Sequence, residues 1–256
     1  MKQALGYTLF FIGMQAVVSS AVVALMNVLG YGSLATSPYT TIGIQILFSV
    51  IIAIVFVRLR WMEATRSYLQ TKPRLVVWWS VLAAVGSVIP SVAFQEQMPE
   101  LPNLVEEQMG EIMNAHGGYF TIALLAPLVE EIVFRGAVLR SLLQWKPERP
   151  WLMIAFSALL FALIHMNPAQ MPHAFLIGLL LGWMFYRTNS IVPSVVFHWA
   201  NNTIAFVLFK LYPNPDTHLV DILGSQRSVA AAVLFSLFIL VPAIYQLNLW
   251  MKKEAE

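Results

Sequence analysis

The stretch YFTIALLAPLVEEIVFRGAVL, residues 119–139, decides the fold class of this chain. It matches the roughly 20 mostly apolar residues that a helix needs to cross the hydrocarbon core of a bilayer. Its charged residues are Glu130, Glu131 and Arg135, and nearly all the others are apolar or small. The stretch therefore predicts a membrane-spanning helix that carries charges within its apolar length.

Seven other apolar runs surround this stretch. They lie near residues 5–29, 41–57, 75–94, 151–166, 173–186, 191–211 and 229–250. The chain is 59% hydrophobic and 11% charged, whereas a soluble domain carries about a quarter charged residues. We therefore expect an all-α fold: one polytopic membrane domain over residues 1–256, a helix bundle with about eight transmembrane helices. Because the runs at 151–166 and 173–186 are short, a re-entrant hairpin over 151–186 stays open as an alternative.

The positions of Lys and Arg predict the orientation, because basic loops are retained on the cytoplasmic side of a membrane. With the N-terminus inside, the cytoplasmic face receives Lys2, Arg58, Arg60, Arg66, Lys72, Arg74, Arg140, Lys146, Arg149, Arg187, Lys252 and Lys253. The opposite face receives the acidic stretch 96–111. We therefore expect both termini to be cytoplasmic.

Composition excludes several classes of function. The chain has no cysteine, which excludes disulfides, thiolate metal sites and a cysteine nucleophile. Its net charge is only +2 and its basic residues form no stripe interleaved with aromatics, so no nucleic-acid partner is expected. The segment 95–116 alone has soluble character, and the spacing of Leu101, Leu104, Val105 and Met109 indicates an amphipathic helix at the outer surface, with a solvated loop as the alternative.

Ionisable groups inside membrane helices are costly and suggest function. Glu131 and Arg135 are four residues apart, so they stack on one helix face and form an ion pair. Glu130 points about 100° away from Glu131 and is free for another partner. A carboxylate in such a site is suited to accept a proton from water. Pro127, one turn earlier, frees a backbone carbonyl beside the site.

Two further runs carry polar groups at depth. The run at 151–166 ends in His165, while His198 and Asn202 lie four residues apart on the run at 191–211 and face one cavity as hydrogen-bond donors. Each group has a structural alternative, because a Glu–Arg pair can join helices and a lone membrane His or Asn is often interhelical glue worth about 0.6 to 2 kcal/mol. His116, His173 and His218 are predicted to lie at the surface.

Three motifs follow one another over residues 119–211. They are Glu130-Glu131-x-x-x-Arg135, Phe161-x-x-x-His165 and His198-x-x-x-Asn202. Their order and spacing resemble the CPBP family, which comprises the type II CAAX prenyl endopeptidases and the bacterial bacteriocin-processing and immunity proteins, including lysostaphin-resistance-like proteins. The resemblance implies an intramembrane endopeptidase of a bacterial inner (plasma) membrane that acts on a membrane-associated peptide or lipidated protein, prenylated or CAAX-like in some members.

The resemblance also implies a role for each motif residue. Glu130 and His165 would activate a water, and His198 and Asn202 would stabilise the oxyanion. The supporting residues are Glu131, Arg135 and Phe161.

Two alternatives concern metal dependence and activity. Glu130, His165 and His198 would make a zinc set with an open position for water. Because no His-Glu-x-x-His motif is present, we expect a metal-free glutamate-type site with no cofactor, and zinc is the alternative. The chain could instead be a non-catalytic membrane partner in bacteriocin immunity or signalling. A proton-coupled transporter with Glu130 as carrier is disfavoured by the lack of an inverted repeat.

Overall fold

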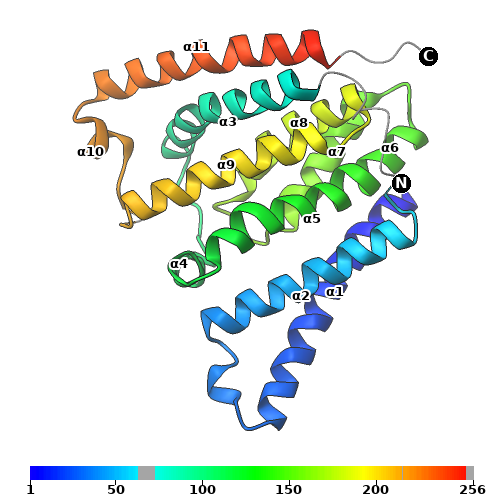
Figure 1. Ribbon diagram of the computed structural model, residues 1–256. Helices are drawn as coiled ribbons and strands as arrows, with labels where there is room; N and C mark the ends of the chain where they lie inside the picture. The colour runs from blue at the N-terminus through cyan, green and yellow to red at the C-terminus, as the bar shows by residue number, and fades with distance from the viewer. Residues whose placement is uncertain (63–72, 215, 252–256) are drawn as a thin grey trace.

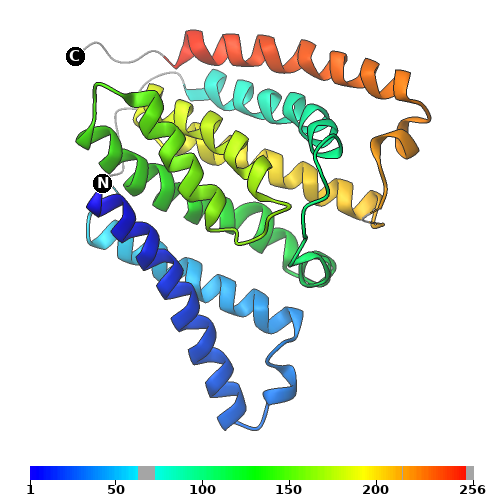
Figure 2. The ribbon, with the colours of Figure 1, turned by 180° about the vertical axis from the view of Figure 1, so that it is seen from behind.

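The computed structural model describes residues 1–62, 73–214 and 216–251, and this part of the chain is helical with no strand. The predicted all-α class is confirmed (Figures 1 and 2). Each of the eight apolar runs falls mostly on helix, and the run at 151–166 leaves the helix after Leu163. Arg66, Lys72, Lys252 and Lys253, which entered the orientation prediction, lie outside the described residues.

The chain begins with a helical hairpin, α1 (Lys2–Val28) and α2 (Pro38–Arg58), joined through the short 3-10 helix η1 (Gly32–Leu34). The side chain of Ser37 caps α2 by accepting a hydrogen bond from the Thr40 backbone N–H, and Pro38 follows at the first helical position. Figure 1 shows that the C-terminal end of α1 diverges from the other helices. The N-terminal half of α1 is anchored by aromatic contacts, including Phe11 against Phe134 at 5.7 Å between ring centroids.

The central helix is built from four consecutive pieces. They are η3 (Phe120–Leu125), α5 (Ala126–Val133), η4 (Phe134–Leu139) and α6 (Arg140–Trp145). Both η3 and η4 are π-helical, a wider winding that occurs mostly as short insertions at functional sites. The predicted run 119–139 is therefore one helix, extended to Trp145, in which α5 and its two carboxylates lie between π-helical turns.

The helices α7 (Pro150–Leu163) and α8 (Met171–Thr188) form a closely packed pair beside the central helix (Figure 1). Glycines allow this approach, because a Cβ at Gly178 would lie 2.9 Å from the Cβ of Ala158. Asn189 ends α8 in the left-handed conformation, with φ of 48°.

The remaining long helices are α3 (Pro73–Glu96), α9 (Val192–Leu211) and α11 (Gln226–Trp250), and the short α10 (Leu219–Leu223) precedes α11. In both views α3 and α11 lie on the side of the molecule opposite α1 and α2 (Figures 1 and 2). The Arg187 side chain donates to the backbone carbonyls of Met251 and Asn248, both at 2.9 Å, and so ties the end of α8 to the end of α11.

The segment 95–116 differs from the predicted amphipathic helix. After α3 ends at Glu96, the segment is helical only over Glu106–Asn114 (α4), and Leu101 and Leu104 lie in the non-helical chain before it. Pro99 and Pro102 lack the backbone N–H that a longer helix would need. This stretch is instead held by the buried Asn167 beyond α7, whose side chain accepts from the Leu104 N–H at 2.9 Å and donates to Asn103 at 2.8 Å.

Five of the described helices are long and apolar enough to cross a membrane: α1, α2, α3, α9 and α11. The helix α7 is apolar but shorter. Large apolar side chains such as Phe235 and Phe238 are exposed on α11, which suits contact with lipid tails. The protein is therefore an integral membrane protein, while the eight-span count and the orientation of the termini stay predictions.

Candidate active site

The base of the site is the ion pair between Glu131 and Arg135, which the sequence predicts and the structure confirms. Arg135 Nη1 lies 2.8 Å from Glu131 Oε1, and the two side chains are 1% and 0% exposed. Arg135 Nη2 also donates to the Gly178 carbonyl at 3.2 Å. The pair therefore fixes the central helix to α8 in a region without solvent.

His198 of α9 reaches both carboxylates. Its Nδ1 lies 3.0 Å from Glu131 Oε1, and its Nε2 lies 3.8 Å from Glu130 Oε2. A buried carboxylate beside Nδ1 favours the tautomer with a proton there and orients the imidazole ring. His198 is thus held with its second nitrogen directed at Glu130, which is the separate partner expected for that side chain.

The two adjacent carboxylates occupy different environments. Glu131 is fully buried and shares one oxygen between Arg135 and His198. The Glu130 side chain is 17% exposed, and its 3.8 Å contact with His198 is longer than a hydrogen bond. Glu130 is therefore the carboxylate that a reacting water can approach.

Phe161 of α7 lies at the centre of the motif residues. The Arg135 guanidinium carbon is 4.5 Å from its ring centroid. The rings of His165 and His198 meet Phe161 edge-on, with centroids at 5.1 and 5.8 Å. Both histidine rings therefore contact the Phe161 ring.

His165 lies in the turn after α7, and its ring is oriented by the backbone of that helix. Its Nδ1 lies 2.9 Å from the Phe161 carbonyl oxygen. A carbonyl only accepts, so Nδ1 carries the proton, and in the neutral ring Nε2 is left as an acceptor. This tautomer suits His165 to receive a proton from water.

Asn202 is positioned by the π-helical turn η3. The Ala126 N–H bonds to the Thr121 carbonyl, five residues back. In that winding the Ile122 carbonyl would pair with residue 127, but Pro127 has no N–H. Asn202 Nδ2 supplies the missing donor at 3.1 Å. The carbonyl that the sequence predicts to be free near Pro127 is therefore bonded to Asn202, whose second amide proton is left for another acceptor.

Three residues near the site were not predicted from the sequence. Asn201 is buried and donates to Asn202 Oδ1 at 3.4 Å. Gly178 supplies the carbonyl that binds Arg135. His173 is a correction, because it is partly buried at the start of α8, within electrostatic range of His165 and His198, and not at the surface. Asn201 lies next to Asn202 and three residues after His198 on α9, so its spacing could have indicated it. Gly178 and His173 lie on α8 and come near the motif residues only through the packing of the helices. The predicted exposure of His116 and His218 is confirmed.

A zinc site would need Glu130, His165 and His198 to converge on one point. In the part of the chain that the structure describes, no three His, Asp or Glu side chains converge closely enough to hold a metal ion. The residues therefore do not fit the three-ligand zinc geometry in this conformation.

Titratable groups that gather inside the apolar helices of a membrane protein commonly form a catalytic site or a transport pathway. This chain therefore belongs to the membrane proteins with a buried polar functional site. Comparison with known families narrows the class. Residues 114–204 match the family model described as "Type II CAAX prenyl endopeptidase Rce1-like". The matched segment contains all seven motif residues and confirms the family resemblance that the motifs predict. No curated protein and no solved structure matches the chain.

Proposed function

We propose that this protein is an intramembrane endopeptidase that hydrolyses a peptide bond of a membrane-associated peptide or protein, prenylated or CAAX-like. One observation carries the proposal. Glu130 is accessible beside an imidazole whose other nitrogen is fixed by the buried Glu131–Arg135 pair. A positioned base next to a preoriented donor is the combination that acyl transfer requires.

The proposed reaction begins with a water held by Glu130 and His165. Glu130 takes one proton as the water oxygen adds to the scissile carbonyl carbon. The negative charge that develops on the carbonyl oxygen is stabilised by His198 Nε2–H and the second Asn202 amide proton. The proton on Glu130 then passes to the leaving amine as the C–N bond breaks, which regenerates the carboxylate.

Charge balance supports the role given to His198. Because Nδ1 donates to Glu131, His198 can donate from Nε2 only when the ring carries both protons. The charges of Glu130, Glu131, Arg135 and protonated His198 then sum to zero, which removes much of the penalty for charge in a buried site. In this scheme Glu131 and Arg135 are positioning residues.

The test is cleavage of a library of prenylated and unmodified peptides by the purified protein in lipid vesicles. We expect Glu130→Gln to lower kcat by about 10² to 10⁴-fold, the usual contribution of a general base. Glu107→Gln, at an exposed position of α4, is the matched control and should keep full activity. Cleavage by Glu130→Gln at the wild-type rate would reject the mechanism. If the wild type and Glu130→Gln complemented a deletion strain equally well, the non-catalytic partner function in immunity or signalling would be favoured.

The metal-free mechanism has a separate test. We expect cleavage to survive exhaustive chelation, because Glu130 transfers the protons and His165 helps to hold the water without a metal. Loss of activity that zinc restores would show instead that Glu130, His165 and His198 rearrange to bind the metal during turnover.

We further propose that eight spans cross the bacterial inner membrane with both termini in the cytoplasm. The supporting observation is the separation of charge along the bundle. Arg58 ends α2 and Arg187 lies in the last turn of α8 at the end of the molecule near the N-terminus, whereas Glu96 ends α3 at the opposite end (Figure 1). Cysteine-labelling of single-cysteine variants at the two ends, starting from a chain without native cysteine, tests the orientation.

A further inference from the structure

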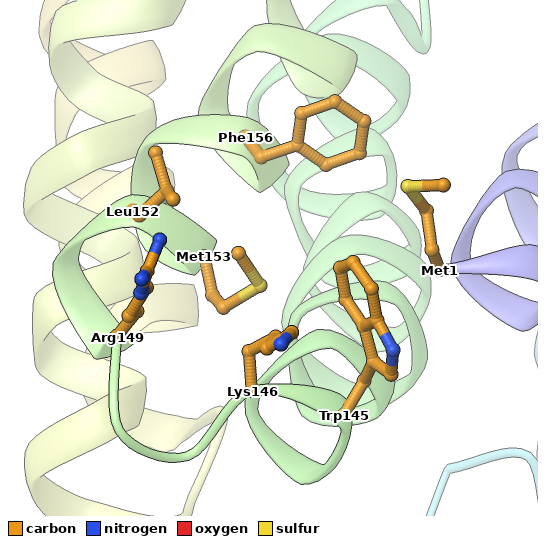
Figure 3. Close-up of a pocket in the computed structure, with 7 residues that line it drawn as sticks. All are labelled: Met1, Trp145, Lys146, Arg149, Leu152, Met153 and Phe156. Atoms are coloured by element: carbon orange, nitrogen blue, oxygen red, sulfur yellow. The ribbon is translucent and has the colours of Figure 1, made fainter.

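A second feature lies at the end of the bundle near the N-terminus. A cavity of about 240 Å³ opens between the start of α1, the end of α6 and the start of α7 (Figure 3). Its wall is apolar and its edge carries two cations. The wall includes Trp145, Leu152, Met153 and Phe156, and the edge carries Lys146 and Arg149.

This cavity is separate from the candidate active site. Trp145 and Glu130 lie on one continuous helix, and at 1.5 Å per residue they are about 20 Å apart along its axis. The cavity therefore needs an explanation of its own, and the inference drawn from it does not depend on the proposed protease activity.

The mouth of the cavity lies at the uncapped N-terminus of α7, where backbone N–H groups have no acceptor in the part of the chain that the structure describes. Pro150 begins α7, and Arg149 at the N-cap position makes no side-chain capping bond. Within the described residues, neither the Trp151 nor the Leu152 backbone N–H has an acceptor. Free N–H groups and the helix dipole make such an N-terminus favourable for a phosphate.

The two cations at the mouth are available to an anion. Lys146 Nζ lies 3.7 Å from Glu148 Oε1 and 5.5 Å from the centroid of the Trp145 ring, and the Lys146 and Glu148 side chains are about half exposed. An exposed pair of this kind is weak and easily exchanged. Arg149 is exposed and has no ion pair within the described part of the chain. Two cations and an uncapped helix end therefore meet at one opening.

The apolar wall indicates that the bound anion carries a hydrocarbon chain. The cavity is smaller than the roughly 300 to 1,000 Å³ typical of pockets for whole small ligands, so it has room for part of a hydrocarbon chain. Trp145 and Trp151 are exposed beside it, as is typical of residues at the level of lipid headgroups. A ligand with a charged head outside and an apolar tail inside fits both parts.

We propose that this cavity is a binding site for an anionic phospholipid of the bilayer. The phosphate lies at the N-terminus of α7 between Lys146 and Arg149, and part of one acyl chain enters the space lined by Met153 and Phe156. Basic pockets between membrane helices are known to select anionic headgroups, and the apolar cavity adds the second half of the recognition.

The experiment is native mass spectrometry of the full-length protein with phosphatidylglycerol or phosphatidylcholine of identical chains. We expect phosphatidylglycerol to be retained preferentially, and the double variant Lys146→Gln/Arg149→Gln to weaken its binding by about ten- to thirtyfold. Arg227→Gln, which removes an exposed cation of α11, is the control and should bind as the wild type does.

Other outcomes would overturn the proposal. Equal retention of the two lipids would show that the site does not read headgroup charge. Displacement of phosphatidylglycerol by inorganic phosphate at comparable concentration would identify a site for soluble anions. Unchanged binding in the double variant, with its fold verified by circular dichroism, would place the lipid elsewhere on the protein.

Discussion

Replacement of Arg135 by alanine probes the buried charges most directly. The guanidinium pairs with Glu131, donates to the Gly178 carbonyl and stacks on the Phe161 ring. Its removal leaves the fully buried Glu131 carboxylate with His198 as its remaining hydrogen-bond partner in the described part of the chain. We therefore expect Arg135→Ala to be strongly destabilising.

The size of the effect follows from the burial of the pair. Removal of one partner of a buried ion pair costs about 3 to 5 kcal/mol, because the other charge stays uncompensated. For a chain of this size each kcal/mol corresponds to a shift of about 2 to 4 °C in Tm, so we expect a decrease of about 6 to 20 °C. Arg135→Lys keeps the charge but not the fork of donors, and should lie between Arg135→Ala and the wild type.

Thermal unfolding in detergent, followed by near-ultraviolet circular dichroism, measures the shift. Arg227→Ala removes an exposed arginine of α11 and should change Tm by no more than about 1 °C, since surface substitutions are nearly neutral. The double variant Glu131→Gln/Arg135→Ala should recover part of the loss, because no unpaired charge is left buried. Equal midpoints for Arg135→Ala and Arg227→Ala would refute the structural role of the pair.

Three further predictions concern packing and positioning. Gly86→Ala should cost about 1 to 3 kcal/mol, because its Cβ would lie 2.6 Å from a backbone nitrogen of α11; Gly43→Ala, with nothing within 4 Å, should instead raise Tm slightly. Phe161→Leu should lower kcat by up to about 10²-fold while the protein stays folded, because both histidine rings lose their edge-on contact with the phenyl ring; an unchanged kcat in the peptide assay would contradict this. Asn167→Ala should cost about 1 to 3 kcal/mol and speed amide exchange at Leu104, whose N–H loses its acceptor; unchanged exchange would show that the contact is dispensable.

The helices were predictable because their signal is local. An apolar run long enough to span a bilayer has few alternatives to a helix, since every backbone polar group must be bonded within the segment. The Glu131–Arg135 pair was predictable for the same reason, because residues four apart meet on any α-helix. The non-helical stretch before α4 was not predictable, because it depends on Asn167, more than sixty positions along the chain, which holds Leu104 outside the helix.

The remaining site contacts depend on packing between distant helices. The bond between His198 and Glu131 joins residues 67 positions apart, so no periodicity indicates that Glu131 contacts the imidazole as well as Arg135. The same holds for Asn202 and the Ile122 carbonyl. The free carbonyl near Pro127 was inferred correctly, but the π winding that selects Ile122 leaves no mark in a pattern read at 3.6 residues per turn.

The two wide turns of the central helix also limit which insertions and deletions the chain can tolerate. Each residue of an α-helix turns the chain by about 100°, so loss of one residue from Phe134–Leu139 would rotate all that follows relative to Glu130 and Glu131. Length in this short segment is therefore constrained as strictly as the identity of any charged side chain, although most of its residues are ordinary apolar ones.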